Sequence, residues 1–271
     1  MTFRRFIRTP KGLLIVVLVV LWACAAAGES VARAAEGTGA AIAVAMAIDG
    51  LMLRRRRRRW VFPDGALLTA LIVAMVLSPS EPWYVPASTA GIAVLSKYLV
   101  RVRTANVFNP AAIGLAATYF LFDTAQSWWG ALPEIAPGAI VLLMATGLFV
   151  ARRVNKVPLV LSFLGSYWLL FTVAAFLGDP SRVAEVYRAP DLHAALYFAF
   201  FMATDPPTSP PRHRDQLVYG ALVAIVSFAV FEANGAVYFL LAGLLAANVW
   251  EGWRRHTTAA GRRLGRGTAV S

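Results

Sequence analysis

Long apolar runs recur at short intervals from Leu13 to Val249, and no polar stretch between them is long enough to form a second domain. Of the 271 residues, 59% are hydrophobic and only 15% are charged, whereas soluble domains carry about 25% charged residues. A soluble globular fold is therefore disfavoured. The pattern predicts one all-α polytopic membrane domain, because a helix satisfies its own backbone hydrogen bonds in lipid.

The apolar runs form two groups of five, which predict about ten transmembrane segments. Their approximate ranges are 13–27, 39–53, 66–77, 85–100, 110–122, 135–150, 157–177, 192–203, 217–231 and 236–250. We expect a single domain over residues 1–256, with repeats at about 11–123 and 135–253, and a basic disordered tail at 257–271. Residues 1–27 also fit a cleaved signal peptide, which stays open as an alternative.

The basic residues lie in clusters between the apolar runs, mostly on one predicted side of the membrane, as topology signals do. With both termini inside, 22 of the 26 lysines and arginines face the cytoplasm, and the opposite loops hold only Arg33, Arg182 and Arg188. This predicts a multi-pass protein of a bacterial cytoplasmic membrane. The six arginines at 54–59 fit a stop signal better than a nucleic-acid or anionic-lipid patch, and anionic lipid is the expected contact of the basic loops and the tail.

Two apolar runs, residues 64–79 and 191–206, share an internal pattern. Each has Asp eleven residues before Met and Pro four residues after it. Because five segments per repeat is an odd number, the second copy would be inverted in the membrane. Both runs are too short for a full span of about 20 residues, which favours broken helices that meet near the midplane. Tilted or interfacial helices are the alternative.

A second pair of segment starts lies at 106–110 and 232–235. Asn109 is placed to cap the helix that Pro110 begins. The single cysteine, Cys24, excludes a disulfide framework and a thiolate metal site. His193 fits an interfacial hydrogen-bonding residue better than a haem ligand, so we expect no metal, and no haem or iron–sulfur cluster held by this chain alone.

The chain resembles the membrane family that contains the D subunit of the Rnf complex and the B subunit of the sodium-pumping Nqr complex. The motifs that carry the resemblance are Asp64-Gly65-Ala66-Leu67-Leu68-Thr69, Ser96-Lys97-Tyr98, Phe108-Asn109-Pro110-Ala111, Phe201-Met202-Ala203-Thr204-Asp205-Pro206 and Asn234-Gly235. The resemblance implies a ten-helix inverted repeat like that of urea and ammonium channels. It also implies flavin and a complex that couples electron transfer to sodium or proton movement.

One departure from the family concerns the outer loop at 123–134. Relatives with covalent FMN attach it to the Thr of a Ser-Gly-Ala-Thr motif in this loop, and this sequence has no such motif. We therefore expect no covalent FMN, and riboflavin or FMN bound without a covalent link. In this loop Trp128 and Trp129 are expected to anchor at the membrane interface.

The broken-helix junctions offer the polar groups that a flavin ring edge and ribityl chain need. The candidate cofactor-binding residues are Asn109, Pro110, Thr204, Asp205, Thr208 and Ser209. The ion-transport candidates are the ionisable residues nearest to hydrocarbon, Lys97, Asp49 and Asp205. Structural alternatives stand beside them: Lys97 snorkels to the cytoplasm, Asp49 pairs with arginines one turn on, and Asp205 caps a segment end. No catalytic residue is expected.

These observations favour an integral membrane subunit of an Rnf/Nqr-like electron-transport complex that carries electrons through non-covalent flavin. Its expected partners are other membrane and extracytoplasmic electron-transfer subunits. The alternative is a free-standing channel or transporter for a small solute or ion, without a redox cofactor. A third hypothesis is a scaffold for a secreted or membrane redox protein.

Overall fold

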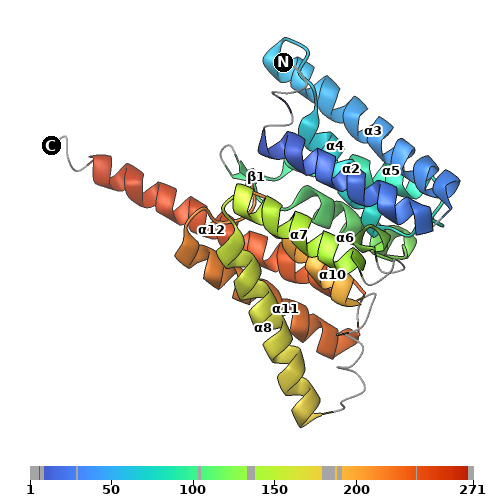
Figure 1. Ribbon diagram of the computed structural model, residues 1–271. Helices are drawn as coiled ribbons and strands as arrows, with labels where there is room; N and C mark the ends of the chain where they lie inside the picture. Colours follow the sequence, from blue (N-terminus) through green and yellow to red (C-terminus); the bar gives the residue numbers. More distant parts are fainter. Residues whose placement is uncertain are drawn as a thin grey trace.

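The computed structural model describes residues 6, 9–28, 30–102, 105–132, 138–178, 187, 191–235 and 237–267. The helices are α2 (Pro10–Gly28), α3 (Val31–Arg57), α4 (Asp64–Val76), α5 (Tyr84–Leu99), α6 (Pro110–Phe122), α7 (Gly138–Arg153), α8 (Val157–Leu177), α10 (Asp191–Tyr197), the π-helix η2 (Phe198–Met202), α11 (His213–Asn234) and α12 (Phe239–Gly267). A short 3-10 helix, η1 (Trp129–Ala131), and the two-residue antiparallel strands β1 (Arg101–Val102) and β2 (Ala105–Asn106) complete the described elements. Figure 1 shows their arrangement.

Each predicted apolar run coincides with a helix in the described part of the chain, if α10 and η2 are taken as one segment. The prediction of an all-helical membrane protein is confirmed. Four of these helices, α2, α3, α8 and most of α11, are long and apolar enough to cross a bilayer. Arg182 and Arg188, which entered the topology prediction, lie outside the described residues. The ten spans and the inverted repeat stay predictions.

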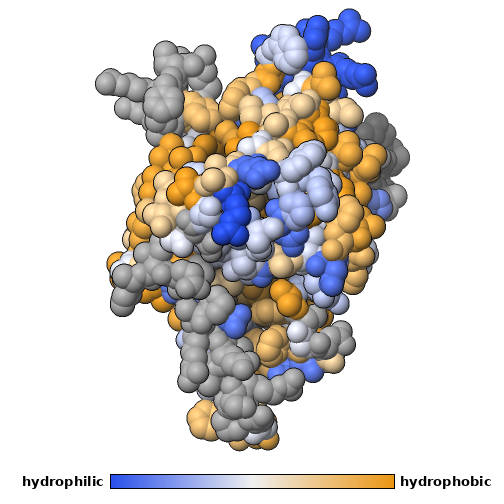
Figure 2. Space-filling model, turned by 90° about the vertical axis from the view of Figure 1, so that its right-hand side faces the viewer, coloured by the Kyte–Doolittle hydropathy of each residue, from blue (hydrophilic) through white to orange (hydrophobic). Residues whose placement is uncertain are grey.

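Apolar side chains cover much of the outer surface (Figure 2). Phe120, Phe176 and Leu177 are among the most exposed, at 70%, 87% and 85%. Large apolar side chains on the outside of a helical bundle destabilise a protein in water but suit one that is surrounded by lipid. This surface agrees with the membrane prediction from composition.

The two predicted short segments are short helices, and they form the centre of the molecule. α4 has 13 residues, and α10 with η2 runs from Asp191 to Met202. At 1.5 Å per residue, each is about 20 Å long, against about 30 Å of hydrocarbon. Every residue in 69–77 and 193–204 is buried. The chain therefore places two helices that are too short to span the membrane inside a shell of the others.

The packing of the first five helices is matched by that of the last five. α3 packs against α5, and α5 against α6; in the second half, α8 packs against α11, and α11 against α12. The first helices of the two halves, α2 and α7, contact each other, and so do the last, α6 and α12. A glycine allows close approach at equivalent places: a Cβ on Gly114 would lie 2.7 Å from the Thr89 carbonyl oxygen, and one on Gly243 would lie 2.5 Å from that of Val223.

The last helix is longer than the sequence predicted. α12 continues to Gly267, so most of the segment expected as a disordered tail (257–271) is helical, and its end projects away from the other helices (Figure 1). The sequence from 257 to 267 has two alanines and three arginines, which favour helix, and three glycines, which do not. It contains no proline, and the helix that begins at Phe239 continues through it.

Candidate functional site

The second short helix ends in a π-helical turn. Ala203 donates its backbone N–H to the Phe198 carbonyl at 3.0 Å, a bond that spans five residues. Phe200 lies against α7 at Gly147, where a Cβ would come within 2.3 Å of the phenylalanine ring. π-Helical turns are rare and are often found at functional sites. The turn ends where the Thr204-Asp205-Pro206 motif begins.

Asn109 joins this turn to the start of α6. Its Oδ1 accepts the Ala112 N–H at 3.1 Å, and Pro110 is the first residue of the helix, so the predicted cap is confirmed. Its Nδ2 also donates to the Met202 carbonyl at 3.0 Å, and its backbone N–H donates to Asn248 Oδ1 at 2.7 Å. The residue is 3% exposed. Through its side chain and its backbone N–H, this one residue connects three segments that are far apart in the sequence.

Asn248 on α12 extends the network, and the sequence-based candidates did not include it. Its Nδ2 donates to the Tyr219 hydroxyl at 2.5 Å and to the Thr208 carbonyl at 3.4 Å. Both Asn248 and Tyr219 are fully buried. Asn248 is a lone amide near the end of the last apolar run, and a polar side chain in such a run signals a hydrogen bond in the interior. That signal was present in the sequence.

The loop after the π-turn is closed by hydrogen bonds of its own. Thr208 Oγ1 donates to Asp205 Oδ2 at 2.9 Å, and Ser209 Oγ donates to the Asp205 carbonyl at 2.7 Å. Thr204 Oγ1 donates to the Phe200 carbonyl at 2.6 Å. Asp205 itself is half-buried and Pro206 is exposed. The Asp205 side chain thus binds within its own loop, and a cap on a segment end by this residue stays a prediction.

Two basic side chains hold this loop from outside. Lys156, from the turn between α7 and α8, donates to the carbonyls of Ser209 at 3.3 Å and Pro210 at 2.6 Å. Arg255 on α12 donates to the carbonyls of Pro207 at 2.5 Å and Ser209 at 3.1 Å. Burial, and then the charge of Arg255, lower the pKa of Lys156 to about 8. In the sequence, Lys156 and Arg255 are two of the 22 basic residues that count as topology signals.

The buried carboxylate of Glu251 orients Arg255. Its Oε1 accepts from Arg255 Nε at 2.7 Å, and its Oε2 accepts from Arg254 Nε at 2.8 Å. Arg254 also pairs with Asp215 at 2.7 Å. The Glu251 side chain is only 1% exposed, and a buried carboxylate requires hydrogen-bonded partners of this kind. The loop therefore rests on a charged support in the middle of α12.

The three predicted ion candidates lie in one electrostatic group. The charges of Asp49 and Asp205 both act on Lys97, and those of Lys97 and Lys156 act on Asp205. Lys97 Nζ donates to the Gly65 carbonyl at 2.8 Å, so it points to the start of α4. This contact differs from simple snorkelling to solvent.

Asp49 has a partner that the sequence did not predict. Its Oδ1 accepts from the Tyr98 hydroxyl at 2.5 Å, whereas the expected partners were arginines one turn on. Arg56, about two turns on, stacks on the Tyr98 ring, with its guanidinium carbon 4.7 Å from the ring centre. Because Asp49 is 6% exposed and bound to a tyrosine, it is less open to a cation than Asp205.

The junction does not fit a flavin through the predicted side chains. Asn109, Thr204, Thr208 and Ser209 are 1–3% exposed, and each already donates to a protein acceptor. Flavin recognition needs polar groups that point into a pocket. Asp205 is the one carboxylate among the candidate cofactor-binding residues, and it is half-buried. One of its oxygens makes no hydrogen bond in the described part of the chain. No group of three His, Cys, Asp or Glu side chains that could hold a metal is found among the described residues.

The outer loop folds onto the end of α4. Leu77 forms a β-bridge with Gln126, and Trp129 Nε1 donates to the Ala74 carbonyl at 2.7 Å. Trp128 and Trp129 are 6% and 4% exposed, so the prediction that they anchor at the interface is wrong: the indole rings fill the space above the short helix. His193 Nδ1 pairs with the Ala131 carbonyl at 2.9 Å, which confirms its predicted hydrogen-bonding role.

A cleft opens beside this loop, at the ends of α3 and α4. Its free volume of about 10 Å³ has room for about one water molecule, and its lining includes Arg33, Thr38, Glu81 and Trp129. Pockets for drug-sized ligands and cofactors measure about 300–1,000 Å³. The cleft is therefore too small to enclose a whole flavin nucleotide. Residues 133 and 134 of the outer loop lie outside the described residues.

The comparisons with known proteins agree with the motifs. The model of the NQR2, RnfD, RnfE family matches residues 7–143 and 134–251. Among similar curated proteins, the D subunit of the ion-translocating oxidoreductase complex of Shewanella amazonensis is 23% identical, over 77% of this chain and 80% of its own length. The proteins of the same name from Pseudomonas paraeruginosa and Escherichia coli are 25% and 24% identical, over 83% and 76% of this chain and 83% and 80% of their own lengths.

Proposed function

The chain belongs to the NQR2, RnfD, RnfE family, as its motifs predicted, and we propose that it is an integral membrane subunit of an ion-translocating oxidoreductase complex of the Rnf type. The observation that carries the proposal is the match across both halves of the chain, together with the junction where Asn109 of the first half binds the π-turn of the second. The proposed location is a bacterial cytoplasmic membrane. The proposed partners are other membrane and extracytoplasmic electron-transfer subunits.

Ten spans in two inverted repeats are part of this proposal. The packing of α3, α5 and α6 is matched by that of α8, α11 and α12, and the equivalent pairs α2–α7 and α6–α12 touch. Contacts between equivalent elements are expected when two copies are related by a pseudo-two-fold axis. Two buried helices, each too short for the bilayer, support a broken-helix centre.

Asp205 is the residue to which we assign ion handling. Its carboxylate is half-buried and partly free, at the point where a short central helix ends. The Lys97 and Lys156 ammonium groups supply its positive surroundings without an ion pair within 4.0 Å among the described residues. A sodium ion or proton that reaches the carboxylate competes with these lysine charges. Movement of Lys97 would therefore change the affinity of Asp205 for the cation.

Non-covalent riboflavin or FMN stays in the proposal as the electron carrier, at a place other than the junction side chains. The donors of Asn109, Thr204, Thr208 and Ser209 are bound to the protein, so we derive no electron-transfer step through them. A bound flavin would supply one- and two-electron chemistry that amino-acid side chains lack. The chain's own contribution at the junction is to hold two half-helices and a carboxylate in place.

Flavin content tests the redox part of the proposal. The full-length protein is purified in detergent, its absorbance is measured, and the denatured band is viewed under ultraviolet light on a gel. Flavin that is present and lost on denaturation is the expected result. A fluorescent denatured band would contradict the absence of covalent FMN. A colourless, well-folded preparation that stays empty after added riboflavin would contradict flavin binding.

The second candidate function is a channel or transporter without a redox cofactor. The occupied donors at the junction favour it, as does the half-buried Asp205, which has one carboxylate oxygen without a hydrogen bond to a described residue. Ion or solute flux through the purified protein in vesicles, without partner subunits or an electron donor, would support this alternative. Copurification of redox subunits with a tagged chain would support the complex.

A further inference from the structure

The six arginines at 54–59, which we call the arginine segment, form a group of charges without an acidic partner among the described residues. Arg54 to Arg57 are the last turn of α3, and Arg58 ends the helix in the left-handed conformation. All six are exposed. Their side chains make no hydrogen bond or ion pair with any described residue, although two of them stack on aromatic rings.

Other basic residues on the same predicted side of the membrane have acidic partners. Lys11 pairs with Asp64 at 2.9 Å, and Arg254 and Arg255 pair with Glu251. Acidic side chains therefore pair with basic groups at the start of α2 and in the middle of α12, whereas no acidic side chain in the described part of the chain pairs with the six arginines at the end of α3. Basic residues stabilise a helix C-terminus through the helix dipole, but that effect falls off within the last turn and does not need six of them.

Two guanidinium groups of the segment are held in fixed positions. The guanidinium carbon of Arg54 lies 4.7 Å from the centre of the Trp60 ring, and that of Arg56 lies 4.7 Å from the centre of the Tyr98 ring. Stacking on a ring leaves the planar fork of N–H donors free at its edge. This fork matches a phosphate in a bidentate way, which a lysine ammonium cannot do.

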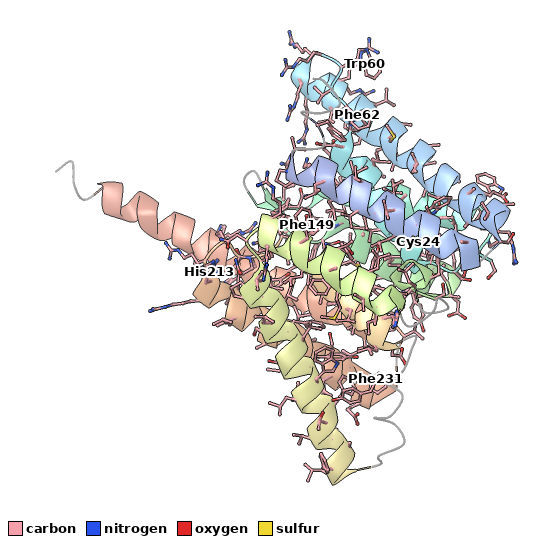
Figure 3. The ribbon with its side chains drawn as sticks, in the orientation of Figure 1. Cys24, Trp60, Phe62, Phe149, His213 and Phe231 are labelled. Carbon is pink, nitrogen blue, oxygen red and sulfur yellow. The ribbon has the colours of Figure 1, made fainter. Side chains whose placement is uncertain are left out.

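The surroundings of the segment place it at the depth of lipid headgroups. Leu51, one turn earlier on α3, is 56% exposed, and Trp60 and Phe62 beyond it are 68% and 54% exposed. Figure 3 labels Trp60 and Phe62 at the top of the molecule, and Figure 2 shows hydrophilic side chains gathered at that end, beside apolar surface. Exposed aromatic residues next to an apolar helix face are typical of the membrane interface.

We propose that the arginine segment, together with Trp60 and Tyr98, is a binding site for the phosphate group of an anionic phospholipid. The charge is complementary, the guanidinium groups are positioned by stacking, and the acyl chains would lie along the exposed side of α3 below Leu51. A topology signal alone needs positive charge, which lysine supplies equally well. The proposal requires membrane insertion and does not depend on flavin or on electron transfer.

Native mass spectrometry of the full-length protein tests the site. Delipidated protein in detergent is titrated with phosphatidylglycerol or phosphatidylcholine of the same acyl chains, and the bound lipids are counted. The wild type is expected to retain phosphatidylglycerol about tenfold better than phosphatidylcholine, because neighbouring cations attract the anionic headgroup. The double variant Arg54→Lys/Arg56→Lys keeps the charge and the topology signal but loses both stacked forks, and its preference is expected to fall about threefold to tenfold.

Arg262→Lys/Arg263→Lys is the matched control, since it makes the same change in another basic cluster of the sequence. It is expected to keep the wild-type preference. Equal retention of the two lipids by the wild type would overturn the proposal, and so would an unchanged preference in Arg54→Lys/Arg56→Lys. Displacement of phosphatidylglycerol by an acidic peptide, but not by inorganic phosphate at the same charge concentration, would assign the surface to a protein partner and overturn it as well.

Discussion

Asn109 Nδ2 donates to the Met202 carbonyl at 3.0 Å, which ties the first residue before α6 to the last residue of the π-turn. The two residues are 93 positions apart and belong to different halves of the chain. Because the same asparagine caps α6, its side chain uses both its donor and its acceptor to fix the junction. The position of the Thr204-Asp205 motif relative to the first half therefore depends on this residue.

Asn109→Ala is expected to destabilise the protein by about 2–4 kcal/mol, since a lost cap costs about 1 kcal/mol and a buried carbonyl without its partner about 1–3 kcal/mol. The fall in melting temperature in detergent measures the loss. Asn109→Ser keeps a cap acceptor but does not reach Met202, so its melting temperature is expected between those of the wild type and Asn109→Ala. Equal loss in the two variants would contradict the separate role of the Met202 contact.

The pKa of Lys156 predicts a dependence of stability on pH. Burial and Arg255 lower this pKa to about 8, from an ordinary value of 10.5. Between these two values the unfolded chain keeps a proton that the folded protein has released, so the free energy of unfolding rises with pH. The slope is at most about 1.4 kcal/mol per pH unit. Below about pH 8 both states are protonated, and the contribution is constant.

Melting temperatures of the wild type and Lys156→Met, measured in detergent from about pH 7 to about pH 10.5, isolate this contribution because other titrating groups cancel in the difference. Above about pH 8 the melting temperature of the wild type is expected to rise relative to that of the variant. Below about pH 8 the difference between the two melting temperatures is expected to stay constant. A difference that does not change with pH would show that Lys156 titrates normally.

The sequence predicted what depends on neighbours along the chain. Apolar runs fixed the helix positions, and the pair Asn109-Pro110 predicted a cap, because capping needs only the next few residues. Contacts between distant segments were not predictable in this way. Lys156 follows two arginines at a helix end and looks like a topology charge, but its two acceptors lie 53 and 54 residues further on.

The two tryptophans of the outer loop show the same limit. Trp128 and Trp129 have the residue type and the place of interfacial anchors, yet both are buried over α4. The end of a membrane span at the interface and a loop that folds over a short helix can have the same types of residue. Only the length of α4, which leaves space above Val76, decides between them.

Gly147 is expected to be intolerant of a side chain. Its Cβ would lie 2.3 Å from Cγ of Phe200, so Gly147→Ala forces the π-turn or α7 to move. Overpacking of this kind costs about 1–3 kcal/mol. Gly165→Ala on α8 is the control, since a Cβ there meets nothing within 4 Å and alanine favours helix by about 0.5–1 kcal/mol.

A lower melting temperature for Gly147→Ala, with an equal or higher one for Gly165→Ala, is the expected pattern. Phe200→Leu in the Gly147→Ala background is expected to recover part of the lost melting temperature, because leucine is smaller than phenylalanine and leaves room for the added Cβ. If Gly147→Ala melts as the wild type does, the close contact between α7 and the π-turn is wrong.

The last prediction concerns Asp205 and Lys97. Asp205→Asn keeps an oxygen that can accept from Thr208 Oγ1, so the fold of the loop is expected to survive. The negative charge is lost, and with it the binding of a sodium ion or proton. Cation uptake by vesicles that contain the assembled complex, driven by its electron donor, should fall to background while the protein's melting temperature stays near that of the wild type.

Lys97→Met is expected to strengthen cation binding at the same site, which Asp205→Asn removes. The Lys97 charge acts on Asp205 and opposes a second cation beside it, so its removal is expected to lower the cation concentration for half-maximal uptake about threefold to tenfold, or roughly 0.7–1.4 kcal/mol. The double variant should behave as Asp205→Asn alone, because Lys97 then has no bound cation to oppose. Normal uptake by Asp205→Asn, or a Lys97→Met effect that persists in the double variant, would remove Asp205 from the ion path and leave it as the residue that closes the Thr204–Pro211 loop.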